Sequence, residues 1–403
     1  MRRDDGLNQV SEFSDLESRC AMRMSLRQAA GSLLVVGLTG TELTGLERAW
    51  LRLLRPGGVI LFRRNIADAT QTQALLEEAT GLGGRHSVRC VDVEGGTVNR
   101  LRDALAPLPS AQAVGASVQR AKKVTLAREH GELIARSVKA FGFNTTLAPV
   151  VDLALPESAG VLGSRPPGAT AAEVVEYARA FLAGFAAHGI TGCGKHFPGL
   201  GGAASDTHFE TPEIDRTFQQ IWDEDLVPYR ELHSVMPMVM MNHAAYPQTP
   251  GKNMPASASP FWVSTVLRKR IGYRGLILSD DLEMGGILKF LPVEEAAIAG
   301  IRAGSDLLAI CHSAELILRT YEALIAEGER STAFLNLLIS RAHDTERKRA
   351  RLYASGPGRP LTAKQFEKLR EHVARFNNRA CVNTTDEDAA EVSRRAVSPA
   401  EAS

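Results

Sequence analysis

The sequence lacks the features that mark several large classes of protein. No apolar run approaches the roughly 20 residues needed to cross a bilayer. The N-terminal stretch is polar and charged, without the apolar core of a secretory signal. Neither sign of charge dominates, because 47 Lys and Arg residues face 46 Asp and Glu residues, for a net charge of +1. We therefore expect a cytoplasmic protein with no nucleic-acid and no membrane partner.

Cysteine is scarce, and nucleotide-binding motifs are missing. The five cysteines are scattered and have no CxxC spacing, which argues against a disulfide framework or a zinc site. The His and Asp residues show no tight ligand spacing such as HExxH, and neither GxGxxG after a strand nor GxxxxGK[ST] occurs. We expect neither a metal nor a cofactor.

What the chain does have is a regular alternation of strand-like and helical segments. Most of the strand-like runs are continuously apolar, as expected for parallel strands that are buried on both faces. The runs cover residues 33–37, 58–62, 87–92, 145–150, 189–195, 236–242, 275–280 and 306–311. Eight strand-then-helix units predict an α/β protein with a (β/α)8 barrel, and a doubly wound open sheet is the alternative.

The helical pattern completes the predicted organisation. Residues 171–188 carry one apolar stripe behind a capping-box pattern formed by Thr170 and Glu173, and residues 122–140 form a second long helix. We expect a polar extension over residues 1–27, a single catalytic barrel over 28–355, and a C-terminal helix with a disordered tail over 356–403.

Polar residues follow the predicted strands at the ends that meet at one mouth of a barrel. Asp92 follows the third strand, Arg165 lies in the loop after the fourth, and Lys195 and His196 end the fifth. Asn242 and His243 end the sixth strand, and Asp280 and Asp281 end the seventh.

These residue types suit glycoside cleavage with retention, which needs an ionised carboxylate as nucleophile and a proton donor across the sugar ring. Asp280 suits the first role. Asp206 and His208 could form a carboxylate–imidazole pair in which His208 exchanges the proton. Arg100, Arg165, Lys195 and His196 are donors for sugar hydroxyls. The plainer alternatives are a helix cap for Asp281, a turn residue for Asp206 and a structural role for His243.

Three motifs resemble one known family. Residues 92–100 read DVEGGTVNR, residues 195–199 read KHFPG and residues 279–282 read SDDL. They resemble the signatures of glycoside hydrolase family 3, in particular its bacterial β-N-acetylhexosaminidase branch, and the similarity runs from about residue 33 to 353.

The resemblance implies a (β/α)8 barrel that hydrolyses terminal β-linked N-acetylglucosamine with retention. It implies that Asp280 is the nucleophile of a glycosyl-enzyme intermediate and that His208 with Asp206 is the acid/base. The family's sugar-binding positions fall on Asp92, Arg100, Arg165, Lys195 and His196. In Gram-negative relatives the substrate is a muropeptide fragment of cell-wall turnover, cleaved in the cytoplasm, and no metal or cofactor is implied.

The sequence departs from the family pattern at two positions. Leu200 stands where the family usually has a second histidine, and Arg165 is followed by Pro166 and Pro167, which stiffen the loop. Two other readings are open: a phosphorylase or hydrolase for another β-glycoside, and a catalytically idle sugar-binding protein on the same barrel.

Overall fold

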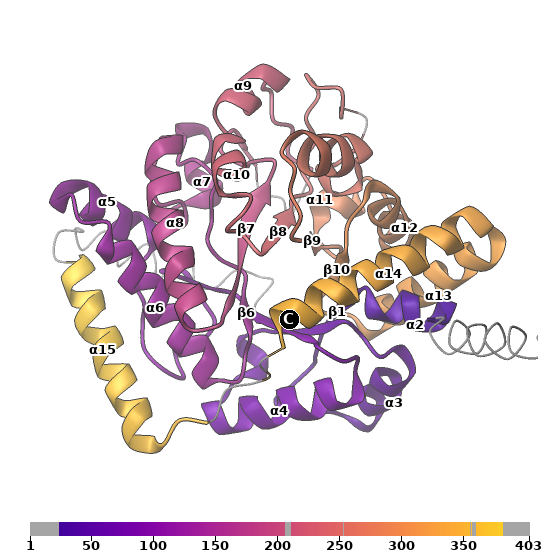
Figure 1. The fold of residues 1–403 in the computed structure, drawn as a ribbon, viewed down its shortest axis with the longest axis horizontal. Helices are drawn as coiled ribbons and strands as arrows, with labels where there is room; N and C mark the ends of the chain where they lie inside the picture. Colours follow the sequence, from indigo (N-terminus) through magenta and orange to yellow (C-terminus); the bar gives the residue numbers. More distant parts are fainter. Residues whose placement is uncertain (1–23, 206–210, 253, 355, 357–359, 382–403) are drawn as a thin grey trace, which may run out of the picture.

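The protein forms a closed barrel of parallel strands surrounded by helices. The computed structural model describes residues 24–205, 211–252, 254–354, 356 and 360–381 (Figure 1). Eight strands close in the order β1-β10-β9-β8-β7-β6-β3-β2, and every neighbouring pair is parallel. They are β1 (Leu34–Gly37), β2 (Gly58–Leu61), β3 (Val88–Val91), β6 (Thr145–Thr146), β7 (Thr191–Phe197), β8 (Met238–Met241), β9 (Leu276–Asp281) and β10 (Leu307–Ile310). The predicted (β/α)8 barrel is confirmed, and the open sheet is not formed.

Helices follow the strands and cover the outside of the barrel. The longer ones are α3 (Gly45–Leu54), α4 (Ala69–Leu82), α5 (Ala111–Ala121), α6 (Thr125–Ala140), α8 (Ala171–Ala187), the π-helix η4 (Phe261–Arg270), α12 (Val293–Ala303), α13 (Ala314–Arg330), α14 (Thr332–Leu352) and α15 (Ala363–Cys381). The shorter ones are α2 (Leu26–Ser32), η1 (Arg63–Asn65), η2 (Pro156–Ser158), α7 (Ala159–Leu162), α9 (Phe218–Asp223), α10 (Val227–Leu232), η3 (Ala256–Ala258) and α11 (Gly285–Leu288).

The strand side chains alternate between two apolar cores. Met238 and Met240 belong to the cluster inside the barrel, whereas Val239 and Met241 belong to the larger cluster between strands and helices. Successive side chains of a strand point to opposite faces, so a strand with both faces buried is apolar at every position. The barrel interior is therefore a packed core, and the site must lie at one of its ends.

Tyr353 closes one end of the barrel. It follows the last turn of α14, belongs to the interior cluster and shares a 2.8 Å hydrogen bond between its hydroxyl and that of Thr145, the first residue of β6. Burial raises its pKa to about 12. The end where the strands begin is therefore plugged, which leaves the end where they finish for the polar residues.

The structure corrects one predicted helix. The helix expected over 122–140 is α6, which begins only at Thr125, and Lys122 lies outside it as the C-cap of α5 at φ 51°. Its N–H bonds to the carbonyl of Val118 as a left-handed C-cap. Glycine or asparagine usually announces this conformation, and here a lysine adopts it, so the sequence carries no stop signal. By contrast, the capping box at Thr170 is confirmed.

The chain outside the barrel is only partly described. Helix α2 crosses the boundary expected at residue 27, and residues 1–23 and 382–403 lie outside the described residues. Helix α15 falls within the predicted C-terminal helix and lies beside α5 and α6 (Figure 1), with Leu369, Val373 and Phe376 buried. No helix in the described part of the chain combines the length and apolarity needed to span a membrane.

Three cysteines form part of the barrel interior. Cys90, Cys193 and Cys311 are free and fully or almost fully buried, and they pack in the barrel interior as small hydrophobes.

We predict that Gly37→Ala strongly destabilises the protein. Gly37 ends β1 where β10 closes the barrel, and an added Cβ would lie 1.8 Å from the carbonyl oxygen of Cys311. The clash is with backbone, so we expect a loss of about 2–3 kcal/mol in the free energy of unfolding, measured by urea denaturation. Gly45→Ala is the control, since an added Cβ there meets nothing within 4 Å. Equal stability of the Gly37→Ala and wild-type proteins would contradict the prediction.

Candidate active site

A short hairpin carries the first motif. After β3, the chain forms β4 (Val93–Gly95) and β5 (Val98–Asn99), which pair antiparallel and were not expected from the sequence. Gly95 and Gly96 turn the hairpin at φ 96° and 61°, and a Cβ on Gly95 would lie 2.1 Å from the carbonyl oxygen of Pro109. The turn therefore requires both glycines. It brings the N–H of Arg100 back to within 3.1 Å of the carbonyl oxygen of Asp92.

Four charged side chains from three separate segments meet at the mouth of the barrel. The ammonium of Lys195 lies 2.8 Å from Asp92 and 2.6 Å from Glu94. The guanidinium of Arg165 holds both oxygens of Glu94 at 2.9 Å. The side chains of Lys195 and Glu94 are 4% and 3% exposed, while those of Asp92 and Arg165 are 15% and 19% exposed. The two inner residues are thus enclosed, and the two outer ones reach toward solvent.

The two enclosed members of the cluster, Glu94 and Lys195, favour their ionised forms. Burial by itself would raise the pKa of Glu94, but the attraction of Arg165 and Lys195 outweighs it and holds the pKa well below the ordinary value. Burial would likewise lower the pKa of Lys195, yet Asp92 and Glu94 raise it overall. A buried ion pair survives only if its partners are complete, so removal of one member would leave an uncompensated charge.

His196 orients Arg165. Its Nδ1 lies 2.7 Å from Asp152 and its Nε2 lies 3.1 Å from Nη2 of Arg165. A guanidinium only donates, so Nε2 accepts and Nδ1 carries the proton toward Asp152. Both ring nitrogens of His196 are engaged within the protein, so the ring holds Arg165 in place. The stiff loop with Pro166 and Pro167 does not prevent Arg165 from reaching Glu94.

Asp152 also fixes the segment that follows β7. Its carboxylate accepts hydrogen bonds from the backbone N–H groups of His196 and Leu200, the latter at 2.8 Å. Asn242 donates to the carbonyl of His196 and to the hydroxyl of Tyr246, which donates to the carbonyl of Gly199. Leu200 itself is buried among apolar side chains. The backbone of this loop is therefore held without a side-chain hydrogen bond from residue 200.

Asp280 lies at the end of β9, at the level of this cluster. Phe197 of β7 pairs with Met241 of β8, which pairs with Ser279 of β9. The residues next to His196 and Asp280 therefore lie at the same level of the barrel. Asp280 accepts a 2.9 Å hydrogen bond from the N–H of Asp281.

A buried histidine holds the backbone beside Asp280. His243 donates from Nε2 to the carbonyl of Asp281 at 3.0 Å, and its Nδ1 accepts from Ser257 at 2.7 Å. Burial lowers the pKa of His243, against the influence of Asp280, in keeping with this neutral form. Asp281 accepts from the N–H of Glu283 in the turn after β9, and it does not cap the next helix, because the N-cap of α11 is Met284.

The structure thus brings together most of the predicted site residues. Lys195 contacts Asp92, His196 contacts Arg165, and Glu94 joins the two pairs. The hairpin brings Arg100 back beside Asp92, and Asp280 lies on β9, two strands from β7. Asp206 and His208 lie outside the described residues, so their predicted pairing stays a prediction. Asp152 was missed as a site residue. Its position in the sequence indicated a site residue, because it ends an apolar run and carboxylates at strand ends converge at one mouth of a barrel.

Asp225 is a second buried carboxyl under the loop after β7. It is 4% exposed, and neither oxygen has a hydrogen-bond partner among the described residues, although Nη1 of Arg216 lies 3.4 Å away. A Cβ built on Gly199 would come 2.7 Å from the Cβ of Asp225. Burial raises its pKa from the ordinary 3.8 to about 7, with Arg216 opposing and Asp152 adding to the rise.

We predict a pH-dependent stability that disappears in Asp225→Asn. Because the pKa of Asp225 is raised on folding, the folded protein binds more protons than the unfolded chain between about pH 4 and 7, so this residue's contribution to stability falls as pH rises through that window. The amide cannot ionise. The stability of Asp225→Asn relative to wild type should therefore rise by several kcal/mol, of the order of 3, between pH 5 and pH 8.

The measurement is urea unfolding at both pH values. Asp223→Asn, the same substitution at an exposed site two residues earlier, is the control and should follow wild type. A constant difference between Asp225→Asn and wild type at the two pH values would show that Asp225 ionises normally.

Comparison with known proteins agrees with this geometry. The model of the glycosyl hydrolase family 3 N-terminal domain matches residues 25–342. A β-hexosaminidase of Stenotrophomonas maltophilia is 35% identical over 309 residues, which cover 76% of this chain and 91% of that protein. A β-hexosaminidase of Idiomarina loihiensis is 33% identical over 300 residues, covering 74% and 90%.

Solved structures show the same relationship. NagZ from Neisseria gonorrhoeae, determined in complex with N-trifluoroacetyl-D-glucosamine, superposes with a TM-score of 0.70 at 29% identity, over 86% of this chain and 98% of that one. A family 3 β-N-acetylglucosaminidase from Paenibacillus gives a TM-score of 0.78 at 28% identity, over 88% and 69%. The chain belongs to glycoside hydrolase family 3 and is a glycoside hydrolase of the β-hexosaminidase type.

Proposed function

We propose that the protein is a retaining exo-β-N-acetylglucosaminidase that removes terminal β-linked N-acetylglucosamine through a covalent glycosyl-enzyme intermediate. The observation that carries the proposal is the register that sets Asp280, at the end of β9, level with the ionised cluster around Lys195. A carboxylate beside a fixed set of donors and acceptors is what displacement at an anomeric carbon requires.

The cluster would bind the sugar through its outer members. Asp92 and Arg165 are the more exposed ends of the network, so Asp92 would accept from sugar hydroxyls and Arg165 would donate to them. Lys195 and Glu94 are enclosed and His196 is committed to Asp152 and Arg165, so these three would mainly hold the outer two in place. Arg100, carried by the hairpin, would add a further donor. Preorganised donors and acceptors need no rearrangement during the reaction.

The reaction would proceed in two displacements. A carboxylate oxygen of Asp280 attacks the anomeric carbon as the bond to the leaving-group oxygen breaks, and His208 gives that oxygen a proton. Water then attacks the anomeric carbon of the glycosyl ester while His208 takes its proton, which releases the sugar and restores Asp280. Asp206 would orient His208 and stabilise its charged form.

The substrate we propose is a muropeptide fragment from cell-wall turnover, cleaved in the cytoplasm. Two relatives support the sugar: the Paenibacillus enzyme is described as a β-N-acetylglucosaminidase, and the Neisseria protein was determined with an N-acylated glucosamine. The absence of a membrane-spanning helix in the described residues is compatible with a soluble substrate.

We predict that Asp280→Ala abolishes turnover. With 4-nitrophenyl β-N-acetylglucosaminide, kcat should fall at least about 10³-fold, because no other group forms the intermediate. The wild type should cleave this substrate far faster than the β-glucoside. Calorimetry should still detect N-acetylglucosamine binding to the variant, and Asp223→Ala, at an exposed site, should keep full activity. Retention of activity within tenfold in Asp280→Ala would remove it as nucleophile.

We predict that His208→Ala affects poor leaving groups far more than good ones. Cleavage of the disaccharide N-acetylglucosaminyl-β-1,4-N-acetylglucosamine, whose leaving group needs a proton, should slow by about 10²–10⁴-fold. The 4-nitrophenyl glycoside should be much less affected at the first displacement. His233→Ala, at a histidine bonded to the carbonyl of Arg230, is the control.

The relative loss for the two substrates tests the role of His208, and product analysis tests whether water or phosphate accepts the sugar. Equal loss for the two substrates would exclude His208 as the acid. Assays with and without inorganic phosphate, followed by product analysis, would show whether the sugar leaves free or as its 1-phosphate.

A further inference from the structure

A cavity lies at the end of the barrel opposite Asp280. Its volume is about 560 Å³, and its lining includes Arg89 in β3, Asn144 just before β6 and Ile190 just before β7. These three strands are neighbours in the barrel, and all three residues lie at or just before the beginning of their strands. Asp92, Lys195 and Asp280 stand at the other ends of β3, β7 and β9, so this cavity is separate from the proposed sugar site.

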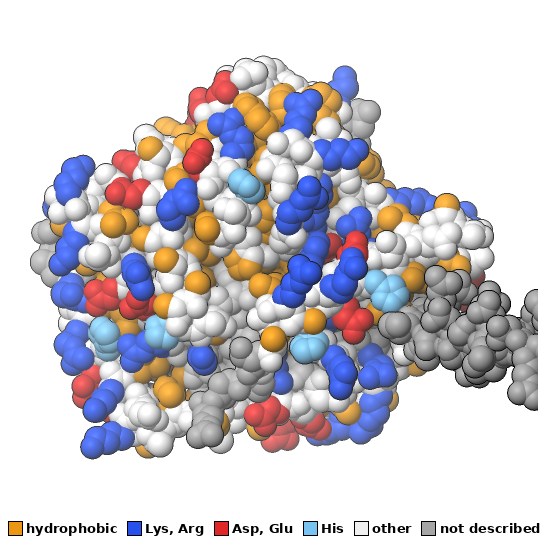
Figure 2. Space-filling view, viewed as in Figure 1, with side chains coloured by type: hydrophobic (Ala, Val, Ile, Leu, Met, Phe, Trp, Pro, Cys, Tyr) orange, Lys and Arg blue, Asp and Glu red, His pale blue; other side chains and the backbone are white. Residues whose placement is uncertain are grey.

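The formally charged residues in the lining of this cavity are cations. They are Arg89 and Lys139, and none of its lining residues in the described chain is Asp or Glu. The imidazoles of His86 and His188 also line it, and burial lowers the pKa of His188, which favours its neutral form. A second cavity of about 410 Å³ shares His86 and adds Arg85, His343 and Arg347, with Glu346 as its acid. Figure 2 shows lysine and arginine side chains gathered over α14, beside which these cavities open. The region as a whole is cationic.

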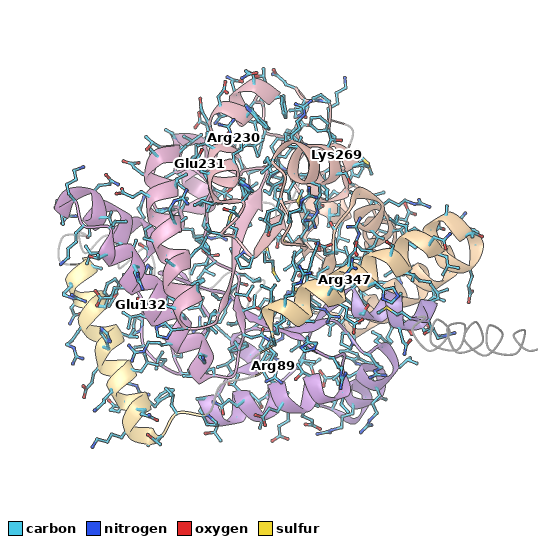
Figure 3. The ribbon with its side chains drawn as sticks, in the orientation of Figure 1. Arg89, Glu132, Arg230, Glu231, Lys269 and Arg347 are labelled. Carbon is cyan, nitrogen blue, oxygen red and sulfur yellow. The ribbon has the colours of Figure 1, made fainter. Side chains whose placement is uncertain are left out.

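The two cations of the larger cavity are paired with neutral groups. Nη2 of the half-buried Arg89 donates to Thr80 at 2.7 Å, and Nζ of Lys139 donates to the carbonyl of His188 at 2.9 Å. Neither forms an ion pair within the described part of the chain. Glu77 influences the pKa of Arg89 only through its charge, without a contact. Glu132 influences the pKa of His188 in the same way, and it lies on α6, well away from Arg89 (Figure 3). A half-buried guanidinium without a carboxylate favours an anion as its partner.

The floor of the cavity is apolar. Phe143, Ile190 and Tyr353 are buried residues that line it, and Tyr353 is the plug of the barrel. A volume of this size matches the pockets of small molecules rather than of a single inorganic ion. The combination of an apolar floor with two cations suits a molecule that has a ring or carbon chain and one phosphate group.

We propose that this cavity binds a phosphorylated small molecule, with its phosphate between Arg89 and Lys139 and its carbon frame against Phe143, Ile190 and Tyr353. Arg89 presents a planar fork that matches phosphate geometry, and Lys139 adds a mobile point charge at the rim. The proposal is independent of the glycosidase mechanism, because the residues involved stand at the opposite end of the barrel.

The test is isothermal titration calorimetry on the full chain with glucose 6-phosphate, inorganic phosphate and glucose as probes. N-acetylglucosamine is present throughout to occupy the sugar site. Glucose 6-phosphate should bind with a Kd below about 1 mM and more tightly than inorganic phosphate, while glucose should not bind. Arg89→Gln and Lys139→Gln should each weaken binding by at least about tenfold.

The controls separate this site from general attraction to a basic surface. Lys139 is exposed, so Lys139→Gln should fold even if Arg89→Gln does not, and Lys269→Gln removes an equal charge from η4, outside both cavities (Figure 3). Lys269→Gln should bind as wild type does. The proposal is overturned if no phosphate probe binds in the presence of N-acetylglucosamine, or if both cavity variants bind like wild type.

Discussion

The buried ion pairs around Lys195 are the interaction on which the mouth of the barrel depends. Lys195 from β7 joins Asp92 and Glu94 from the β3 end, and Glu94 joins Arg165 from the loop after β6. Because Lys195 and Glu94 are almost enclosed, each would be costly without the other. The cluster therefore ties three segments into one fixed arrangement and leaves Asp92 and Arg165 as its more exposed members.

A second layer of acids supports this arrangement from below. Asp152 binds the ring of His196 and two backbone N–H groups, and Asp225 lies directly beneath Gly199. The family's usual histidine at position 200 is replaced by a buried leucine, and the backbone bonds from Asp152 and Tyr246 keep the loop in place. Neither carboxyl oxygen of Asp225 has a hydrogen-bond partner among the described residues, so this acid supports the loop by packing.

The two ends of the barrel differ in electrostatics. At the mouth, cations and carboxylates are matched pair by pair, as at a site built to hold a neutral sugar beside a reactive carboxylate. At the plugged end, Arg89 and Lys139 face a cavity without a described acid in its lining. The packed interior between them, with Tyr353 at its base, keeps the two ends apart.

The sequence by itself determined the barrel, the order of its strands along the chain, and the residue types at the mouth, because buried parallel strands are apolar throughout and polar residues begin where they end. It also indicated Asp280 and the family motifs. Only the tertiary structure decided which charges pair. Asp152 and His196 are 44 residues apart and Lys195 and Asp92 are 103 apart, and no local pattern encodes such contacts. The sequence did not predict the turn at Lys122 or the carboxyl of Asp225 that lacks a hydrogen-bond partner among the described residues. Surrounding packing fixes both features, and the residue types themselves do not indicate them.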